Sequence, residues 1–180
     1  MSPAPSRAVV LVSGGLDSTT ALGYDGRAQA EARRAVAAAG SLTADQQQAI
    51  AARHAELQGR WDEAIRIYRQ MRRRYPDDLE HGLEMARAQI AGGAGEEALA
   101  TLEELRRMPP PAGNDARIDL VAAEAAKRLT DFPRQQAAAE RAARRAESLG
   151  AHLLYAEARA AFCDALVNQG QMVAGRAACD

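Results

Sequence analysis

A short motif recurs along this chain at an interval of 34 residues. The segment GRWDEA at residues 59–64 is echoed by GAGEEA at residues 93–98, and a proline follows the opening glycine of each segment by seventeen positions, at Pro76 and Pro110. A fixed interval of this length is typical of a chain built from repeated supersecondary units. Each unit buries its apolar face against its neighbours, so the chain is predicted to form an array.

The segments that follow the two glycines have the periodicity of amphipathic helices. Apolar side chains recur every three or four positions, at Ala64, Tyr68, Met71 and Tyr75 in the first unit and at Ala98, Leu102 and Leu105 in the second. This spacing places them on one side of a helix. Pro76 and Pro110 are expected to end the two helices, because proline lacks the backbone N–H that a helix needs.

The segments that precede the glycines are also predicted to be helical. Thr43 and Gln46 fit a capping box, so that a helix is expected to run from about residue 44 to residue 58. Asp77 and Asp78 can cap a further helix. The apolar stripe of this further helix consists of Leu79, Leu83, Ala86 and Ile90.

Weaker copies of the turn lie at residues 23–28, 130–135 and 170–172. Aromatic residues make up only 4% of the chain, so the core must consist of aliphatic side chains, including many alanines. Ala64 and Ala98 are predicted to lie where two helices cross, because a small side chain lets helices approach closely. The predicted fold is all-α: about four partial antiparallel helical hairpins in a right-handed superhelix.

These units resemble the tetratricopeptide repeat (TPR) family, whose pattern has glycine, alanine, aromatic residues and proline at these offsets. The resemblance covers residues 23–180, and its strongest stretch, residues 49–126, is similar to the repeat regions of bacterial winged-helix regulators and protein kinases. The residues that carry it, and that are predicted to define the packing of the repeats, are Gly59, Trp61, Ala64, Tyr68, Pro76, Gly93, Ala98, Leu102 and Pro110.

The family resemblance implies an α-solenoid that binds a protein or peptide in a concave groove, lined by the first helix of each hairpin. Residues expected on or near this groove are Arg53, Glu56, Arg87 and Gln89. The array is expected to be truncated at both ends, since residues 23–39 have the pattern of a second helix without its first, and residues 170–180 begin a second helix. No polar capping helix is predicted, so the uncapped ends are expected to permit self-association.

The N-terminal residues have a different pattern, that of a β-strand followed by an anion-binding loop. An apolar run at residues 8–12 leads into SGGLDSTT at residues 13–20. Gly14 and Gly15 allow backbone N–H groups to approach an anion, and a helix that begins near Asp17 would direct its positive end towards it. Hydroxyl donors are supplied by Ser13, Ser18 and Thr19.

This loop resembles the pyrophosphate loop (PP-loop) of the N-type ATP pyrophosphatases. The longer segment AVVLVSGGLDSTT is similar to the N-terminus of the 7-cyano-7-deazaguanine synthase family, which acts in queuosine precursor synthesis. The resemblance implies that ATP and magnesium are cofactors of an ATP-using synthase or ligase. It also implies that ATP pyrophosphate is bound by Ser13, Gly14, Gly15, Asp17, Ser18 and Thr19.

The rest of such an enzyme is not predicted anywhere in the chain. The nucleotide and substrate pockets of a doubly wound fold need further parallel strands, and Cys163 and Cys179 cannot supply the four-cysteine zinc site of the synthase family. We therefore predict an incomplete loop segment at residues 1–22 and a truncated repeat domain at residues 23–180. A chimeric reading frame, with its seam near residues 20–23, is our hypothesis for the origin of the join.

Charge disfavours nucleic acid and membrane as partners, because 23 lysines and arginines are balanced by 24 acidic residues. Two basic helix faces are predicted, one at Arg66, Arg69, Arg72, Arg73 and Arg74 and one at Arg141, Arg144 and Arg145. Acidic residues close to the first face predict a solvated, ion-paired surface. They are Asp62, Glu63, Asp77, Asp78 and Glu80.

The histidines at His54, His81 and His152 are isolated, so no metal site is predicted, and no arrangement of a nucleophile and a base is apparent. The apolar run at residues 8–12 is too short for a signal peptide or a membrane span, which predicts a cytoplasmic protein. The expected function is a non-enzymatic protein–protein interaction scaffold without a cofactor. The alternative is an ATP-dependent PP-loop enzyme of which only the loop is present.

Overall fold

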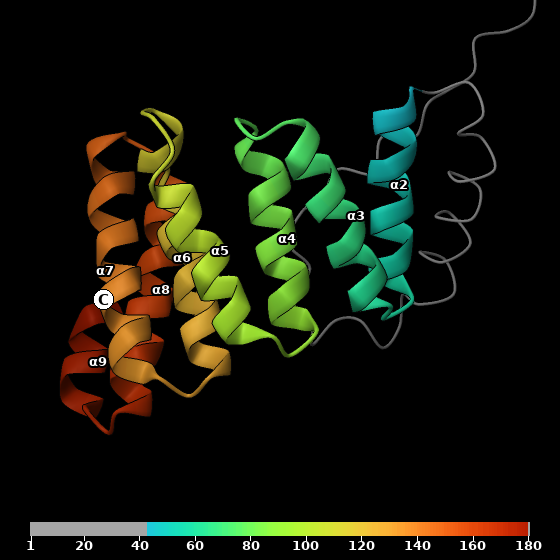
Figure 1. The fold of residues 1–180 in the computed structure, drawn as a ribbon. Coiled ribbons are helices and arrows are strands. Elements are labelled where there is room, and N and C mark those ends of the chain that lie inside the picture. Colours follow the sequence, from blue (N-terminus) through green and yellow to red (C-terminus); the bar gives the residue numbers. More distant parts are fainter. Residues whose placement is uncertain (1–42, 180) are drawn as a thin grey trace, which may run out of the picture.

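The computed structural model describes residues 43–179, the last of them by its backbone alone, and these residues are arranged as a row of helices (Figure 1). The predicted loop segment and the helix expected at residues 23–39 lie outside the described residues. The helices are α2 (Ala44–Leu57), α3 (Trp61–Arg74), α4 (Leu79–Ala91), α5 (Gly95–Arg106), α6 (Ala116–Arg128), α7 (Phe132–Ser148), α8 (His152–Asn168) and α9 (Met172–Cys179), with a short 3₁₀ turn, η3 (Ala112–Asn114), before α6.

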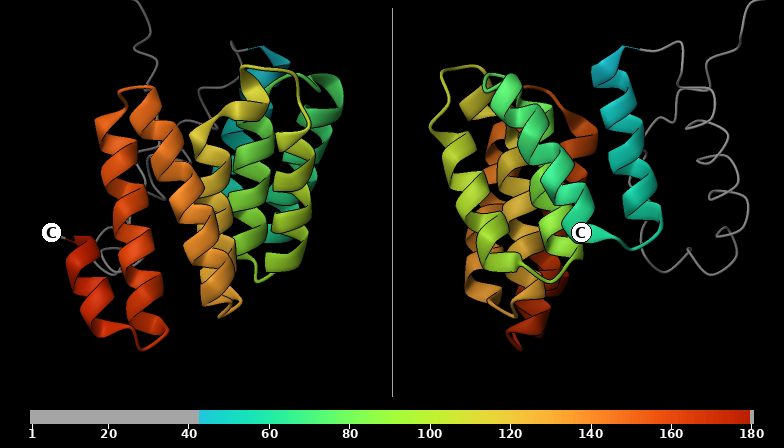
Figure 2. Two further views of the ribbon diagram at one scale, coloured as in Figure 1. Left: turned by 90° about the vertical axis from the view of Figure 1, so that its left-hand side faces the viewer. Right: turned by 45° about the vertical axis from the view of Figure 1, so that its right-hand side comes forward.

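Each helix packs against the next one along the chain, so that α2/α3, α4/α5, α6/α7 and α8/α9 form four hairpins. The first helices of successive hairpins also meet, since α4 contacts α6 and α6 contacts α8. Figure 2 shows the hairpins stacked side by side, each helix antiparallel to the next. The predicted all-α repeat fold is therefore confirmed, and no strand occurs within residues 43–179.

Local capping determines where several helices begin. At the start of α2 the backbone N–H of Gln46 donates to Thr43 Oγ1 at 3.3 Å, and the backbone N–H of Thr43 donates to Gln46 Oε1 at 3.1 Å, which confirms the predicted capping box. Asp78 caps α4 by accepting from the backbone N–H of Glu80 at 2.8 Å. The same arrangement recurs in α6, where Asp115 accepts from the backbone N–H of Arg117.

The core consists largely of alanine and leucine, in two main clusters. One cluster joins α2 and α3 to Met85 and Ala88 of α4. The other joins α5, α6 and α7 to the opposite flank of α4, through Leu83, Ala86 and Ile90. Helix α4 therefore belongs to both clusters and connects the first hairpin to the rest of the array.

Two details of the predicted helices were wrong. Tyr75 was expected on the apolar face of α3, but it follows the last residue of that helix, is 40% exposed, and donates a hydrogen bond from its hydroxyl to Asp45. Pro110 was expected to end its helix, but α5 ends at Arg106, before the Pro109–Pro111 run begins. Pro76 does follow directly on the C-cap of α3, as predicted.

The turns within the hairpins share one backbone conformation. Gly59, Gly93 and Gly170 have positive φ angles of 68°, 84° and 78°. At the corresponding turn between α6 and α7 the residue is Thr130, with a φ angle of 57°. A β-branched residue is strained in this left-handed region, whereas glycine adopts it freely.

Replacement of Thr130 by glycine is expected to stabilise the protein by about 0.5–1 kcal/mol, because the relief of strain exceeds the added entropy of the unfolded chain. The variant loses one exposed hydrogen bond, from Thr130 Oγ1 to the Leu129 carbonyl at 2.7 Å. Urea denaturation measures the difference in the free energy of unfolding. The matched control is Gly93→Thr, which should destabilise, since an added Cβ at Gly93 meets no atom within 4 Å and the backbone strain acts alone. A less stable Thr130→Gly variant would contradict the strain argument.

Candidate functional site

The described helices contain neither a cluster of metal-binding side chains nor a membrane-spanning segment. Within residues 43–179, no group of three histidine, cysteine or acidic side chains lies close enough together to hold a metal ion. None of the described helices has the length and apolar character needed to cross a bilayer. The notable polar features of this part of the chain are clusters of charged side chains between neighbouring helices.

The first cluster, which we call the first-helix network, joins α2 to α4. Arg53 lies between two carboxylates: its Nη1 is 2.7 Å from Glu56 Oε2 and its Nη2 is 3.1 Å from Glu84 Oε2. Glu84 in turn contacts Arg87 Nη1 at 3.0 Å through its other oxygen. Arg53, Glu56, Glu84 and Arg87 therefore form a chain of alternating charges across the first helices of two hairpins.

The two carboxylates of this network are partly withdrawn from solvent, with side chains only 12% and 15% exposed for Glu56 and Glu84. Burial raises the pKa of Glu56, although the charge of Arg53 and hydrogen bonds from Arg53 and Tyr68 act in the opposite direction. Burial and the neighbouring Glu56 also raise the pKa of the Tyr68 hydroxyl. Tyr68 thus links the network to the core cluster of the first hairpin.

The structure brings together three of the four residues expected near the groove. Arg53, Glu56 and Arg87 are all in the first-helix network, but Gln89 is not. Gln89 is buried on another side of α4, where its Oε1 accepts a hydrogen bond from Thr101 of α5 at 2.9 Å. Sequence reasoning missed Glu84, whose position three residues before Arg87 is the signal that could have identified it, because residues at this spacing are neighbours on a helix.

The other residues singled out in the sequence are more widely distributed. The six PP-loop residues, Ser13, Gly14, Gly15, Asp17, Ser18 and Thr19, lie outside the described residues. Ala64, Tyr68, Ala98 and Leu102 are buried in the core, and Trp61 is half-buried at the start of α3. Pro110 lines a cavity of about 650 Å³ with Leu149 and Leu154, between the α5–α6 linker and the α7–α8 turn.

A second cluster surrounds Asp119 of α6, which has no exposed surface. Arg106 of α5 contacts its carboxylate, and Arg141 Nε and Arg145 Nη1 of α7 lie 3.0 and 3.1 Å from it. Three helices are therefore linked through one buried carboxylate. The third arginine predicted on this face, Arg144, pairs with Glu140 at 3.1 Å, so all three arginines of the second basic face are ion-paired.

The first predicted basic face is only partly ion-paired. Arg72 pairs with Glu104 at 2.9 Å and Arg74 pairs with Asp45 at 2.8 Å. The remaining arginines of this face, Arg66, Arg69 and Arg73, have no ion pair with any described residue, and none of the five pairs with the acidic residues named from the sequence. The prediction was wrong in this respect because it took closeness along the chain for closeness in space.

The buried carboxylate at the centre of the second cluster should be important for stability. Asp119→Asn is expected to lower the free energy of unfolding by about 2–3 kcal/mol, because three arginines lose the charge that compensates them. Urea denaturation measures the loss. Glu140→Gln is the matched control, since it breaks an exposed i,i+4 pair and should change stability by less than about 0.5 kcal/mol. Equal effects of the two substitutions would show that water, rather than Asp119, compensates the arginines.

Comparison with known proteins agrees with the repeat architecture. Residues 55–125 match a family model described as tetratricopeptide repeat, a span that runs from the end of α2 into α6. No curated protein matches the chain, and no solved structure matches it. The match falls within residues 49–126, the stretch in which the resemblance is strongest, and it includes the two left-handed turn glycines, Gly59 and Gly93. Residues 55–125 are therefore similar in sequence to the tetratricopeptide repeat, and they lie within an all-α array of helical hairpins.

Proposed function

We propose that residues 43–179 form a non-enzymatic scaffold that binds a protein partner, or a peptide segment of one, along the face formed by the first helices α2, α4, α6 and α8. The family match supports this at the general level, since tetratricopeptide repeats mediate protein–protein interactions. Stacked hairpins provide an extended surface of first helices on which a partner can contact several repeats at once.

A row of charged residues at equivalent repeat positions is the observation that carries the proposal. Arg53, Arg87, Glu124 and Asp164 are separated by 34, 37 and 40 residues, the same intervals that separate the turn residues 59, 93, 130 and 170. Each first helix thus has one charged residue at the same place. The row changes from arginine on α2 and α4 to carboxylates on α6 and α8, so a partner segment with the reverse order of charges would be bound in one direction. Such a segment must compete with internal ion pairs, since Arg53 and Arg87 contact Glu84 and Asp164 contacts Lys127 at 3.1 Å.

Substitutions in this row should reduce partner binding without unfolding the array. The full chain is immobilised and exposed to lysate of its source cells, and bound proteins are identified by mass spectrometry. The variant Arg87→Gln/Glu124→Lys is expected to retain at least tenfold less of a protein partner than the parent chain does. Both substituted side chains are accessible and lie at the centre of the row.

The matched control is Arg107→Gln/Glu147→Lys, which makes the same changes at exposed positions outside the row. A partner retained by the parent and the control but lost by the row variant supports the proposal. If every bound protein is retained equally by all three, the first-helix face is not the binding surface.

The alternative function, an ATP-dependent PP-loop enzyme, depends on the motif at residues 13–19. The two hypotheses differ in their response to nucleotide. A non-enzymatic scaffold should have the same melting temperature with and without ATP and magnesium, because it gains no binding energy from them. A rise in Tm that Asp17→Ala abolishes would instead favour the enzyme, and Asp62→Ala, at an aspartate outside the loop, is the control.

A further inference from the structure

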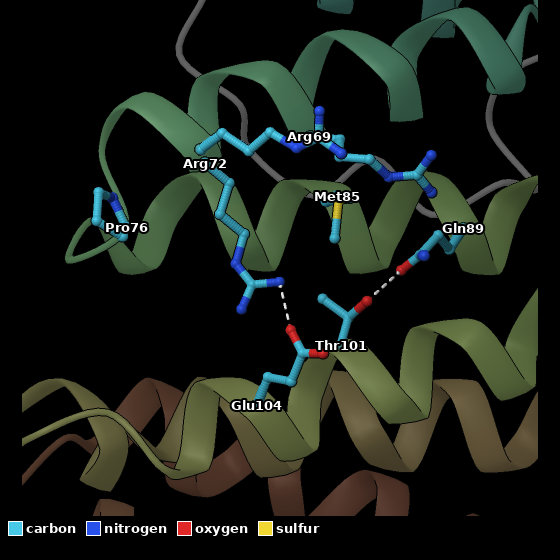
Figure 3. Close-up of a pocket in the computed structure, with 8 residues that line it drawn as sticks. Arg69, Arg72, Pro76, Met85, Gln89, Thr101 and Glu104 are labelled. Atoms are coloured by element: carbon cyan, nitrogen blue, oxygen red, sulfur yellow. Dashed lines mark hydrogen bonds and ion pairs between the residues drawn. The ribbon is translucent and has the colours of Figure 1, made fainter.

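A cavity of about 460 Å³ lies between α3 and α5, over α4 (Figure 3). Its floor includes Met85 and Gln89 of α4, and its walls are arginines of α3 and the Thr101–Glu104 segment of α5. Around the axis of α4, the side chains of Met85 and Gln89 point more than a quarter of a turn away from that of Glu84. They point about half a turn away from that of Arg87. The cavity and the first-helix network therefore lie on different sides of α4.

The walls of the cavity carry more positive than negative charge. Three arginines line it, and only Arg72 has an ionic partner, Glu104 of the facing helix at 2.9 Å. Arg69 and Arg73 have no ion pair with any residue that the structure describes. Figure 3 shows Arg72 directed across the cavity to Glu104, and Arg69 extended above Met85 towards Gln89. Two guanidinium groups are thus available to a ligand.

The floor of the cavity adds a fixed polar group. Gln89 and Thr101 are only 3% and 5% exposed, and the Thr101 hydroxyl donates to Gln89 Oε1 at 2.9 Å. That bond fixes the orientation of the amide, whose nitrogen has no acceptor among the described residues. The unpaired groups of Arg69, Arg73 and Gln89 are donors, and Glu104, whose carboxylate lines the cavity, is paired with Arg72, so a complementary ligand supplies acceptor oxygens and negative charge.

We propose that this cavity binds acidic side chains of a protein segment, at a second site distinct from the first-helix face. Carboxylates match both the charge and the fork geometry of the arginines. A nucleic acid fits less well, because its phosphates need a continuous basic surface, and the α5 side of the cavity carries the exposed Glu104. The residues that line the cavity also include no aromatic ring on which a base could stack.

The test measures binding of a fluorescein-labelled peptide of eight glutamates to the full chain by fluorescence anisotropy. Arg69→Gln/Arg73→Gln is expected to weaken binding about tenfold, since it removes both unpaired guanidinium groups. Arg66→Gln/Arg128→Gln is the matched control: it removes the same charge from exposed positions outside the cavity and should change the Kd by less than about twofold. Circular dichroism checks that both variants keep their helices.

A third variant tests the role of the internal ion pair. Glu104→Gln releases Arg72 and removes a competing carboxylate from a side chain that is 59% exposed, so peptide affinity should rise. Absence of binding by the parent, or equal weakening in the two arginine variants, would overturn the proposal. A single-stranded oligonucleotide of equal charge is tested as a competitor beside the unlabelled peptide. If the oligonucleotide displaces the labelled peptide at a lower concentration than the unlabelled peptide does, the proposal is overturned in favour of nucleic acid.

The proposal for the cavity and the proposal for the first-helix face can be refuted independently. Arg87→Gln/Glu124→Lys, which tests the first-helix face, leaves every residue of the cavity in place and should bind the glutamate peptide as the parent does. Loss of peptide binding in that variant would contradict a separate site. Unchanged peptide binding together with unchanged partner retention would refute the first-helix face alone.

Discussion

Close contact between neighbouring helices, made possible by alanine at the crossing points, is the constraint on which the rest of this array depends. Ala64 and Ala98 have no exposed surface, and a longer side chain at either position would push two helices apart. Gly82 has a similar role in α4, because an added methyl group would overlap with Leu105 of α5. Helix α4 packs into both main clusters and forms the floor of the cavity between α3 and α5. A shift of α4 would therefore disturb both the contact between the first hairpin and the rest of the array and the shape of this cavity.

Charged side chains are arranged around this apolar frame in two ways. Some connect helices and are satisfied within the molecule, as in the first-helix network and around Asp119. Others, such as Arg69 and Arg73, project from α3 without an ionic partner in the described structure. The difference matters for function, because a satisfied pair must be broken before it can bind a partner, whereas an unpaired guanidinium next to a cavity is available at once.

Features that depend on neighbouring residues in the chain could be predicted from the sequence. The capping box of Thr43 and the cap at Asp78 involve contacts over two or three residues, and glycine marks three of the four left-handed turns within the hairpins, the exception being the turn at Thr130. Features that depend on packing between helices could not. The surroundings of Asp119 come from three helices, and Gln89 is buried because Thr101 lies opposite, across the α4–α5 interface. The end of α5 at Arg106 likewise precedes the prolines that were expected to cause it.

The cluster at Asp119 also has a consequence for how the array is held together. Because arginines from α5 and α7 share one carboxylate on α6, the loss of either flanking helix would remove part of the positive charge that compensates this buried group. The boundary between the second and third hairpins is thus held by an ionic contact to a fully buried carboxylate. The ionic contacts across the first boundary, Arg53–Glu84 and Arg72–Glu104, involve side chains that are partly exposed.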